Sequence, residues 1–274
     1  MKPQVSEVLN RARRRLASAS FQPTTREANL LLAHTLGWTE AQVLARHDHT
    51  LEDDDRSRFD LALGRRLTGE PIAYILGRRE FYGRQFNVDA RVLIPRPETE
   101  HLVESALELP LPPSPTVLDV GTGSGCLACT IALERPTSLV IGTDVSPGAL
   151  AVAKSNLTQH GLSERLHLVG TDLARGLALE KVDLVLSNPP YIGYDEASDL
   201  SPEIVDFEPE LALFADGSGA AFHRRLLTEL SAVSSGSWLV IEIGAAQEQL
   251  VRESSIDSPF QLVEIRPDYA GLPR

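Results

Sequence analysis

Cysteine, aromatic residues and long apolar runs are scarce in this sequence of 274 residues. It has two cysteines, Cys126 and Cys129, so the disulfide framework of a small secreted protein is excluded. No apolar run approaches the roughly 18 residues of a membrane-spanning helix, and the first residues lack the apolar core of a signal peptide. An apolar content of 42% still provides for a large core. We therefore expect a globular cytoplasmic protein without a membrane partner.

Basic residues are also in deficit, since 26 Lys and Arg oppose 38 Asp and Glu and give a net charge of −12. The deficit is uneven, because residues 1–73 hold 11 basic and 10 acidic side chains and are nearly neutral. The excess of acid lies in the remainder, and this change in composition predicts a domain boundary near Pro71. A net negative charge also counts against binding to phosphate backbones, so nucleic acid is a disfavoured partner.

The spacing of apolar residues predicts an α/β protein with a small helical bundle in front. Helical spacing in the first segment occurs near residues 5–16, 28–35, 39–46 and 52–68. An aromatic-rich alternation at residues 81–88 is broken by Gly83 and is typical of a β-hairpin. Short apolar runs then follow at 116–120, 139–143, 166–169, 182–187 and 238–243, the first three separated by helical patterns at 126–134 and 147–160. This series predicts a mostly parallel sheet covered on both faces.

A glycine-rich turn follows the first of these strands. Its residues are Gly121, Thr122, Gly123, Ser124 and Gly125. Glycine at such a turn lets the backbone N–H groups approach a ligand at the start of the next helix. Cys126 stands where a dinucleotide fingerprint needs its third glycine, which argues against a nicotinamide cofactor.

Acidic residues lie at the ends of three successive strands: Asp119, Asp144 and Asp172, the last followed by Leu173. A carboxylate at position 119 would repel a pyrophosphate but attract an ammonium or sulfonium group. Asp144 is placed to accept both hydroxyls of a ribose, and Asp172 with Leu173 to contact an adenine. This pattern favours S-adenosylmethionine over a dinucleotide as the cofactor. The alternative is a tight strand-to-helix turn that binds no ligand.

Cys126 and Cys129 have the spacing of a redox or zinc motif. Because no second pair or nearby histidine supplies further ligands, we predict that they pack inside a helix. No metal site is predicted.

Asn188-Pro189-Pro190-Tyr191 follows the predicted strand at 182–187, at the sheet edge where open α/β folds bind ligands. These residue types suit methylation of a planar nitrogen. The Asn188 side-chain oxygen and the Pro189 carbonyl can each accept one N–H, while Pro190 stiffens the turn and Tyr191 can stack on the substrate. An amide nitrogen and an exocyclic adenine amine both present two such N–H groups.

These motifs together resemble the amino-methyltransferase superfamily. The stretch from Phe81-Tyr82-Gly83 to Arg96-Pro97-Glu98-Thr99-Glu100 narrows the likeness, and the chain resembles the HemK/PrmC family over nearly its whole length. Enzymes of that family methylate the glutamine amide of the Gly-Gly-Gln motif in class I peptide chain release factors, which modulates translation termination. The resemblance implies a Rossmann-like class I methyltransferase domain at 96–274, a β-hairpin linker at 74–95 and a helical substrate-recognition domain at 1–73.

By the same resemblance, residues 121–125, Asp144, Leu173 and Asn188 contact S-adenosyl-L-methionine, whose product is S-adenosyl-L-homocysteine. Asn188 to Tyr191 hold the substrate glutamine. Some relatives carry an aromatic residue where Leu173 stands. The partner implied is a class I release factor, and we expect a monomer.

Three alternatives remain at this point: a glutamine methyltransferase that acts on a ribosomal protein, an adenine-N6 methyltransferase of nucleic acid, and a cofactor-binding module without catalysis. A base-modifying enzyme must hold phosphates. Residues 193–210 contain seven acidic residues and no Lys, Arg or His, so this loop should repel a nucleic-acid backbone. A module without catalysis has no need for the Asn-Pro-Pro-Tyr motif.

Overall fold

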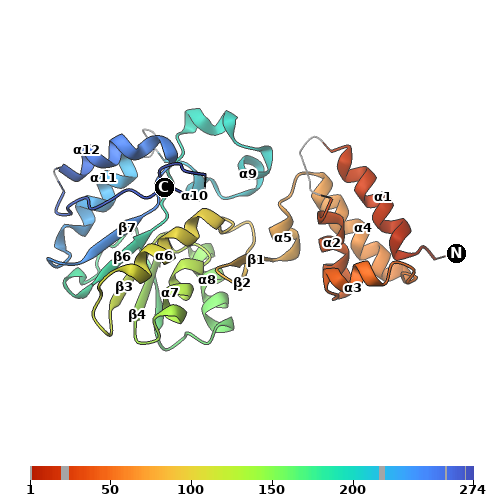
Figure 1. Ribbon diagram of the computed structural model, residues 1–274, viewed down its shortest axis with the longest axis horizontal. Coiled ribbons are helices and arrows are strands. Elements are labelled where there is room, and N and C mark those ends of the chain that lie inside the picture. The colour runs from red at the N-terminus through yellow and green to blue at the C-terminus, as the bar shows by residue number, and fades with distance from the viewer. Residues whose placement is uncertain (1, 20–24, 216–219, 257, 269) are drawn as a thin grey trace. The chain divides into compact units, whose positions relative to one another are not determined.

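The computed structural model describes residues 2–19, 25–215, 220–256, 258–268 and 270–274 (Figure 1). They form two compact units, which are described separately below. The first comprises Met1–Gly77 with Leu200–Phe207, and the second comprises Arg78–Asp199 with Glu208–Arg274. The domain limits at residues 73 and 95 stay a prediction from the sequence.

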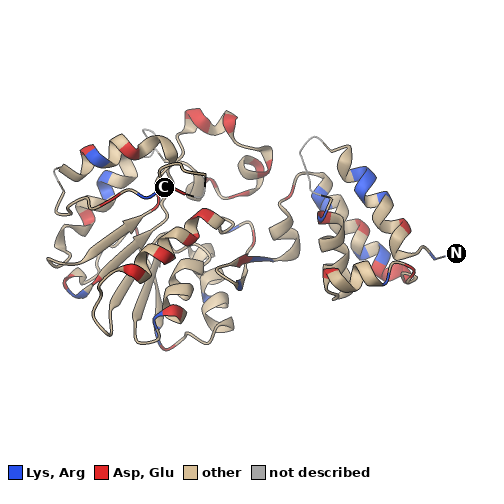
Figure 2. Cartoon of the chain, in the orientation of Figure 1, with Lys and Arg blue, Asp and Glu red and all other residues tan. Residues whose placement is uncertain are grey.

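The first unit is helical, as the sequence predicts. Its helices are α1 (Val5–Ala17), α2 (Glu27–Leu36), α3 (Glu40–Ala45), α4 (Asp53–Leu67), α5 (Ile72–Leu76) and the later α9 (Pro202–Phe207). Helix α4 begins with three aspartates and has Arg65 and Arg66 in its last turn, an order that complements the helix dipole. Arg14 and Arg15 occupy the last turn of α1 in the same way. Figure 2 shows both signs of charge on these helices.

Arg66 is buried in this unit and binds two carboxylates. Its Nε donates to Glu27 Oε2 at 2.6 Å, and its Nη2 forms an ion pair with Glu203 on α9. Its Nη1 donates to the carbonyl oxygen of Glu70 at 3.1 Å. The ion pair with Glu203 holds residues 200–207, a segment from much later in the chain, within the helical unit.

The second unit begins with a two-stranded hairpin, β1 (Arg78–Phe81) and β2 (Arg84–Asn87). Its turn residues, Tyr82 and Gly83, have φ values of +50° and +72°. Positive φ at both positions matches the twist of a tight hairpin. Phe81 and Phe86 pack edge to face in the core of the unit.

Five parallel strands form the main sheet, in the order β5-β4-β3-β6-β7. They are β3 (Thr116–Val120), β4 (Leu139–Asp144), β5 (Leu166–Gly170), β6 (Leu184–Ser187) and β7 (Trp238–Ile241). The α-helices of this unit are α6 (Glu100–Glu108), α7 (Cys126–Glu134), α8 (Pro147–Gln159), α10 (Glu210–Leu213), α11 (Ala220–Glu229) and α12 (Glu248–Ile256). The predicted α/β fold with a parallel sheet is confirmed.

Each face of the sheet is covered by its own apolar cluster. Val117, Val140 and Leu184 face one way and pack with residues of α6, α7 and α8. Leu118 and Val185 face the other way and pack with Leu226 of α11. Because both faces of the sheet are covered, successive residues on β3 and β6 are apolar: Val117 and Leu118, and Leu184 and Val185.

The strand register sets which residues meet at the carboxyl edge. Val120 pairs with Ser187, and Ser187 pairs with Ile241. The next residues on the three strands, Gly121, Asn188 and Glu242, therefore emerge side by side at this edge. Strand β3 is central, and its neighbours β4 and β6 lie on opposite sides of it. The strand order therefore changes direction at β3, and open α/β sheets bind ligands at the carboxyl edge beside such a point.

Within the described residues, no helix combines the length and the apolar character needed to cross a bilayer. The same part of the chain holds no group of three His, Cys, Asp or Glu residues arranged for a metal ion. Both cysteines are buried in α7, as predicted, and burial raises the pKa of Cys126 to about 12.

Candidate active site

A cavity of about 490 Å³ lies at the carboxyl edge of the sheet. This volume is in the usual range for sites of small organic ligands. Most of the residues predicted to bind a cofactor or substrate line it: Asp119, Gly121, Thr122, Gly123, Ser124, Asp144, Asp172, Leu173, Asn188, Pro189 and Pro190. Gly125 and Tyr191 lie outside its wall. Four strand ends thus contribute to one cavity.

The glycine-rich turn is folded back onto β4. The N–H groups of Gly121 and Thr122 both donate to the carbonyl oxygen of Thr143, at 2.9 and 2.8 Å. Gly125 has φ +76°, and a Cβ on it would lie 3.1 Å from the Cβ of Ala153. This glycine therefore permits close packing of α7 against α8, and its contact with a cofactor stays a prediction.

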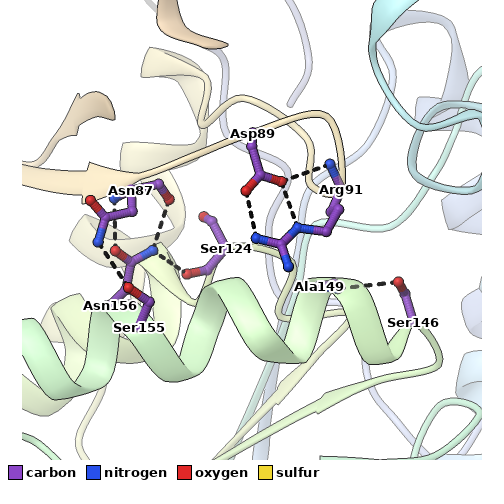
Figure 3. A network of polar contacts seen from close by, with 8 residues as sticks. All are labelled: Asn87, Asp89, Arg91, Ser124, Ser146, Ala149, Ser155 and Asn156. Carbon is purple, nitrogen blue, oxygen red and sulfur yellow. Dashed lines mark hydrogen bonds and ion pairs between the residues drawn. The ribbon is translucent and has the colours of Figure 1, made fainter. Parts of the chain in front are cut away.

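Asn156 on α8 braces the same turn from behind (Figure 3). Its side chain is fully buried, and its Nδ2 donates to Ser124 O at 2.8 Å and to Asn87 O at 3.0 Å. Its Oδ1 accepts from Asn87 N at 2.7 Å. One amide thus ties the hairpin strand β2 to the turn that lines the cavity.

Asp119 is almost completely buried at the cavity wall. Its Oδ2 accepts a 2.6 Å hydrogen bond from Thr122 Oγ1. Burial raises the pKa of Asp119 to about 7, and the negative charge of Asp144 acts in the same direction. A cation in the cavity would offset both effects.

Asp144 faces the glycine turn from the end of β4. Its two oxygens accept from Gly123 N at 2.9 Å and from Ser146 N at 2.8 Å. The carboxylate is therefore fixed in orientation by backbone N–H groups at the cavity wall.

Beyond β5, Asp172 and Leu173 form another part of the wall. Asp172 accepts from Arg225 Nη2 at 2.7 Å, so its charge is already paired at the surface. Leu173 is buried and has φ +57°, a conformation that branched and bulky residues rarely adopt. Such strain tends to occur at ligand sites, in agreement with the position of Leu173 in the wall.

Asn188 begins the Asn-Pro-Pro-Tyr segment, directly after β6. The strand end is fixed by Ser187, whose Oγ donates to Val120 O at 2.8 Å. The Asn188 Nδ2 donates to Thr99 Oγ1 at 2.9 Å, and Thr99 also lines the cavity.

Tyr191 is mostly buried beside the cavity. Its hydroxyl lies 3.3 Å from Glu242 Oε1, and the guanidinium of Arg274 lies 5.6 Å from its ring centre. Burial and the charge of Glu242 raise the pKa of Tyr191 to about 12, so the hydroxyl stays protonated. Its backbone oxygen accepts from Gln247 Nε2 at 2.8 Å. The aromatic pair at the cavity wall is instead Tyr194 and Phe214, stacked at 5.1 Å.

Two of the seven acids in residues 193–210 are neutralised by arginine. Glu208 is buried and accepts from Arg96 Nη2 at 2.6 Å and from Ile94 N at 3.1 Å. Glu203 pairs with Arg66 in the helical unit. Asp195, Glu196, Asp199, Asp206 and Glu210 are exposed. Figure 2 marks the acidic residues of α9 in red.

Two regions of the sequence match family models: the PrmC N-terminal domain over residues 7–77 and the methyltransferase small domain over residues 99–210. The release factor glutamine methyltransferase of Cereibacter sphaeroides is 40% identical over 270 residues, which cover 98% of this chain and 96% of the relative. That of Neisseria gonorrhoeae is 43% identical over 251 residues, 90% of each chain. This chain belongs to the release factor glutamine methyltransferase family. The resemblance seen in the sequence is confirmed.

Among solved structures, the fold is similar to the hMettl16 catalytic domain in complex with MAT2A 3'UTR hairpin 6. The TM-score is 0.50 at 19% identity, over 70% of this chain and 72% of that chain. At this identity the likeness concerns the fold alone.

Sequence reasoning did not identify Thr99, Glu242 or Gln247 as part of this region. Glu242 carried a detectable signal, because it is an acid inside the apolar run 238–243 and is completely buried. Thr99 lies 89 residues before Asn188, so nothing local in the sequence connects the two.

Proposed function

We propose that this protein transfers a methyl group from S-adenosyl-L-methionine to the side-chain amide nitrogen of the glutamine in the Gly-Gly-Gln motif of class I release factors. The observation that carries the proposal is that Asn188, Pro189 and Pro190 line the same cavity as Asp119 and Asp144. Membership of a family whose members are named release factor glutamine methyltransferases supports the choice of substrate.

The cavity residues fit such a cofactor. Asp119 is a buried acid whose ionised form needs a cation nearby, and a ligand with an ammonium or sulfonium group would provide one. We propose that Asp144 accepts ribose hydroxyls, that residues 121–124 approach the cofactor through their backbone, and that Leu173 and Asp172 contact the adenine. The bound cofactor would supply an electrophilic methyl group and leave as S-adenosyl-L-homocysteine.

The chain's own contribution to the reaction is orientation. We propose that the Asn188 Oδ1 and the Pro189 carbonyl oxygen each accept one N–H of the substrate amide. This arrangement would hold the nitrogen with its lone pair toward the methyl group, and an oriented reactant reacts faster. As the new N–C bond forms and the methyl–sulfur bond breaks, the amide nitrogen would lose one of its two protons to water, so that the methylated amide is neutral. Proline at positions 189 and 190 keeps the carbonyl in place, because its ring fixes φ. The stacking role of Tyr191 stays a prediction, because the ring lies outside the cavity wall.

The exposed acids Asp195, Glu196 and Asp199 follow the motif directly and oppose a nucleic-acid backbone. These acids give no reason to prefer one protein substrate over another. The choice of release factors over ribosomal proteins is supported by family membership. Since release factors act in translation, we also propose a cytoplasmic location. The monomeric state stays a prediction.

The proposal is tested with methyl-labelled cofactor and a set of acceptors. These are a purified class I release factor, the same factor with the Gly-Gly-Gln glutamine changed to alanine, a ribosomal protein fraction and duplex DNA. We expect label on the unmodified factor alone. Label on DNA, on ribosomal protein, or equally on the alanine-substituted factor would overturn the proposal.

A further inference from the structure

A chain of hydrogen bonds links Asn188 through Thr99 to Glu242, the residue directly after β7. Asn188 Nδ2 donates to Thr99 Oγ1 at 2.9 Å, and Thr99 Oγ1 donates to Glu242 Oε2 at 2.7 Å. Thr99 is 3% exposed and Glu242 is fully buried. The other oxygen of Glu242 lies 3.3 Å from the Tyr191 hydroxyl. One carboxylate is thus linked to both ends of the Asn188–Tyr191 segment, to Tyr191 directly and to Asn188 through Thr99.

While Glu242 is ionised, the donors and acceptors of this chain have a fixed direction. A threonine hydroxyl has one hydrogen, and an ionised carboxylate can only accept. The hydrogen of Thr99 is therefore used toward Glu242, and Thr99 presents lone pairs to Asn188. Asn188 must then face Thr99 with its NH₂ group, because its oxygen would meet another acceptor.

This direction matters because an asparagine amide has nearly the same shape after half a turn. In one orientation Asn188 offers Oδ1 to the cavity, and in the other it offers two N–H donors. Only the first can accept an N–H from a substrate amide, while the second would place donors against donors. Since Nδ2 is bound to Thr99, Oδ1 lies on the opposite branch of the planar amide.

We propose that Thr99 and Glu242 are positioning residues that set the orientation of the Asn188 amide and so make its oxygen the acceptor for the substrate. This role rests on the proposed function of Asn188 as the group that holds the reacting amide. The Glu242 carboxylate accepts the hydrogen of the Thr99 hydroxyl, and this hydroxyl then accepts from the Asn188 NH₂ group. Neither Thr99 nor Glu242 needs to contact the substrate.

Several groups act on Glu242 and bear on its charge. Thr99 and Tyr191 are hydrogen-bond donors, and Arg274 Nε lies 3.7 Å from Oε1. These three favour the ionised form, whereas burial and the charge of Glu98 oppose it, and the pKa of Glu242 is raised overall. Protonated Glu242 could donate to Thr99 and release the constraint on Asn188.

Four variants test the proposal by kinetics. Thr99→Val removes the hydroxyl at nearly constant shape, Thr99→Ser keeps it, and Glu242→Gln removes the acceptor-only character. Thr130→Val is the matched control, since Thr130 is buried in α7 and its hydroxyl has no hydrogen-bond partner among the described residues. We expect kcat to fall about 10- to 100-fold in Thr99→Val and Glu242→Gln, the usual range for residues that orient a primary contact. The kcat of Thr99→Ser should stay within about threefold of the wild-type value, and the kcat of Thr130→Val should equal the wild-type value. The KM for cofactor should be nearly unchanged in all four variants.

A second readout does not depend on any substrate. The sequence contains five asparagines, Asn10, Asn29, Asn87, Asn156 and Asn188, so protein labelled with ¹⁵N-asparagine gives few side-chain amide signals. The Asn188 signal, assigned with Asn188→Ala, should shift in Thr99→Val and Glu242→Gln and stay in place in Thr99→Ser and Thr130→Val.

The outcomes separate this inference from the proposed function. If the wild type methylates no release factor but the Asn188 signal responds as expected, the proposed function fails and the orientation by Thr99 stands. Wild-type kcat in Thr99→Val, an equal loss in Thr99→Val and Thr99→Ser, or an Asn188 signal unchanged in Thr99→Val would each overturn the positioning role.

Discussion

Thr122 donates a 2.6 Å hydrogen bond to Asp119, and both side chains are buried at the wall of the cavity. This bond favours the ionised carboxylate, but burial outweighs it, and the pKa of Asp119 is raised to about 7. A carboxylate with such a pKa makes both stability and cofactor affinity depend on pH near neutrality.

For stability, the native protein holds the Asp119 proton between pH 3.8 and about pH 7, whereas the unfolded chain releases it. Because the native state binds more protons, the contribution of this group to the free energy of unfolding falls as the pH rises through that window. Denaturant titrations of the ligand-free protein at several pH values measure this loss. In Asp119→Asn the side chain cannot titrate, so this pH-dependent part of the free energy of unfolding should be absent.

For binding, we expect the opposite trend. An ionised Asp119 attracts a cationic cofactor, so affinity for S-adenosylmethionine should rise as the pH increases through about 7, with release of a proton on binding. Calorimetry in buffers of different ionisation enthalpy measures both quantities. A pH profile identical in the wild type and Asp119→Asn would contradict the assignment.

Asn188→Ala removes the side-chain acceptor at the carboxyl end of β6. We expect turnover to fall by roughly two orders of magnitude or more, as after loss of one preorganised polar contact. Cofactor affinity should fall much less. Single-turnover kinetics with saturating cofactor separate the two, and near-normal turnover would refute the mechanism proposed above.

Asp144→Ala should have the reverse effect. The carboxylate is fixed by Gly123 N and Ser146 N, and the proposed ribose contact belongs to the cofactor. Weaker cofactor binding should dominate over any change in turnover at saturation. An unchanged dissociation constant for the cofactor would count against the ribose role.

Asn156→Ala tests the brace behind the glycine turn. The change removes hydrogen bonds to Asn87 and to Ser124 O and leaves buried backbone groups without that partner. We expect a loss of about 3 kcal/mol in the free energy of unfolding. Thr158→Ala on the exposed side of α8 is the control and should cost within about 0.5 kcal/mol. Equal stability of the two variants would show that the brace contributes little.

The sequence was sufficient for the elements whose signal is local. The apolar run 116–120 and the helical pattern 126–134 coincide with β3 and α7, since both segments are largely buried and therefore rich in apolar residues. The strand predicted at 238–243 is shorter in the structure, where β7 ends at Ile241. The next residue, Glu242, accepts a hydrogen bond from Thr99.

The position of a residue in the cavity wall was predictable where the carboxyl end of one strand delivers it, as for Asp119, Asp144 and Asn188, whose contacts with a ligand stay predictions. It was not predictable where tertiary packing decides. Gly125 belongs to the motif but packs against Ala153, and Tyr191 follows Pro190 but turns to Glu242. Thr99 and Glu242 meet only because η1 (Pro97–Thr99) and β7 come together in the fold.

The central claim is the transfer of a methyl group to one amide nitrogen, and peptide mass spectrometry tests it most directly. A class I release factor is incubated with this protein and S-adenosylmethionine, digested, and the Gly-Gly-Gln peptide is fragmented. We expect one added methyl group on the side-chain amide of that glutamine in the wild-type reaction, and none with Asn188→Ala. An unmodified glutamine after incubation with folded, cofactor-binding protein, or a methyl group on another residue, would contradict it.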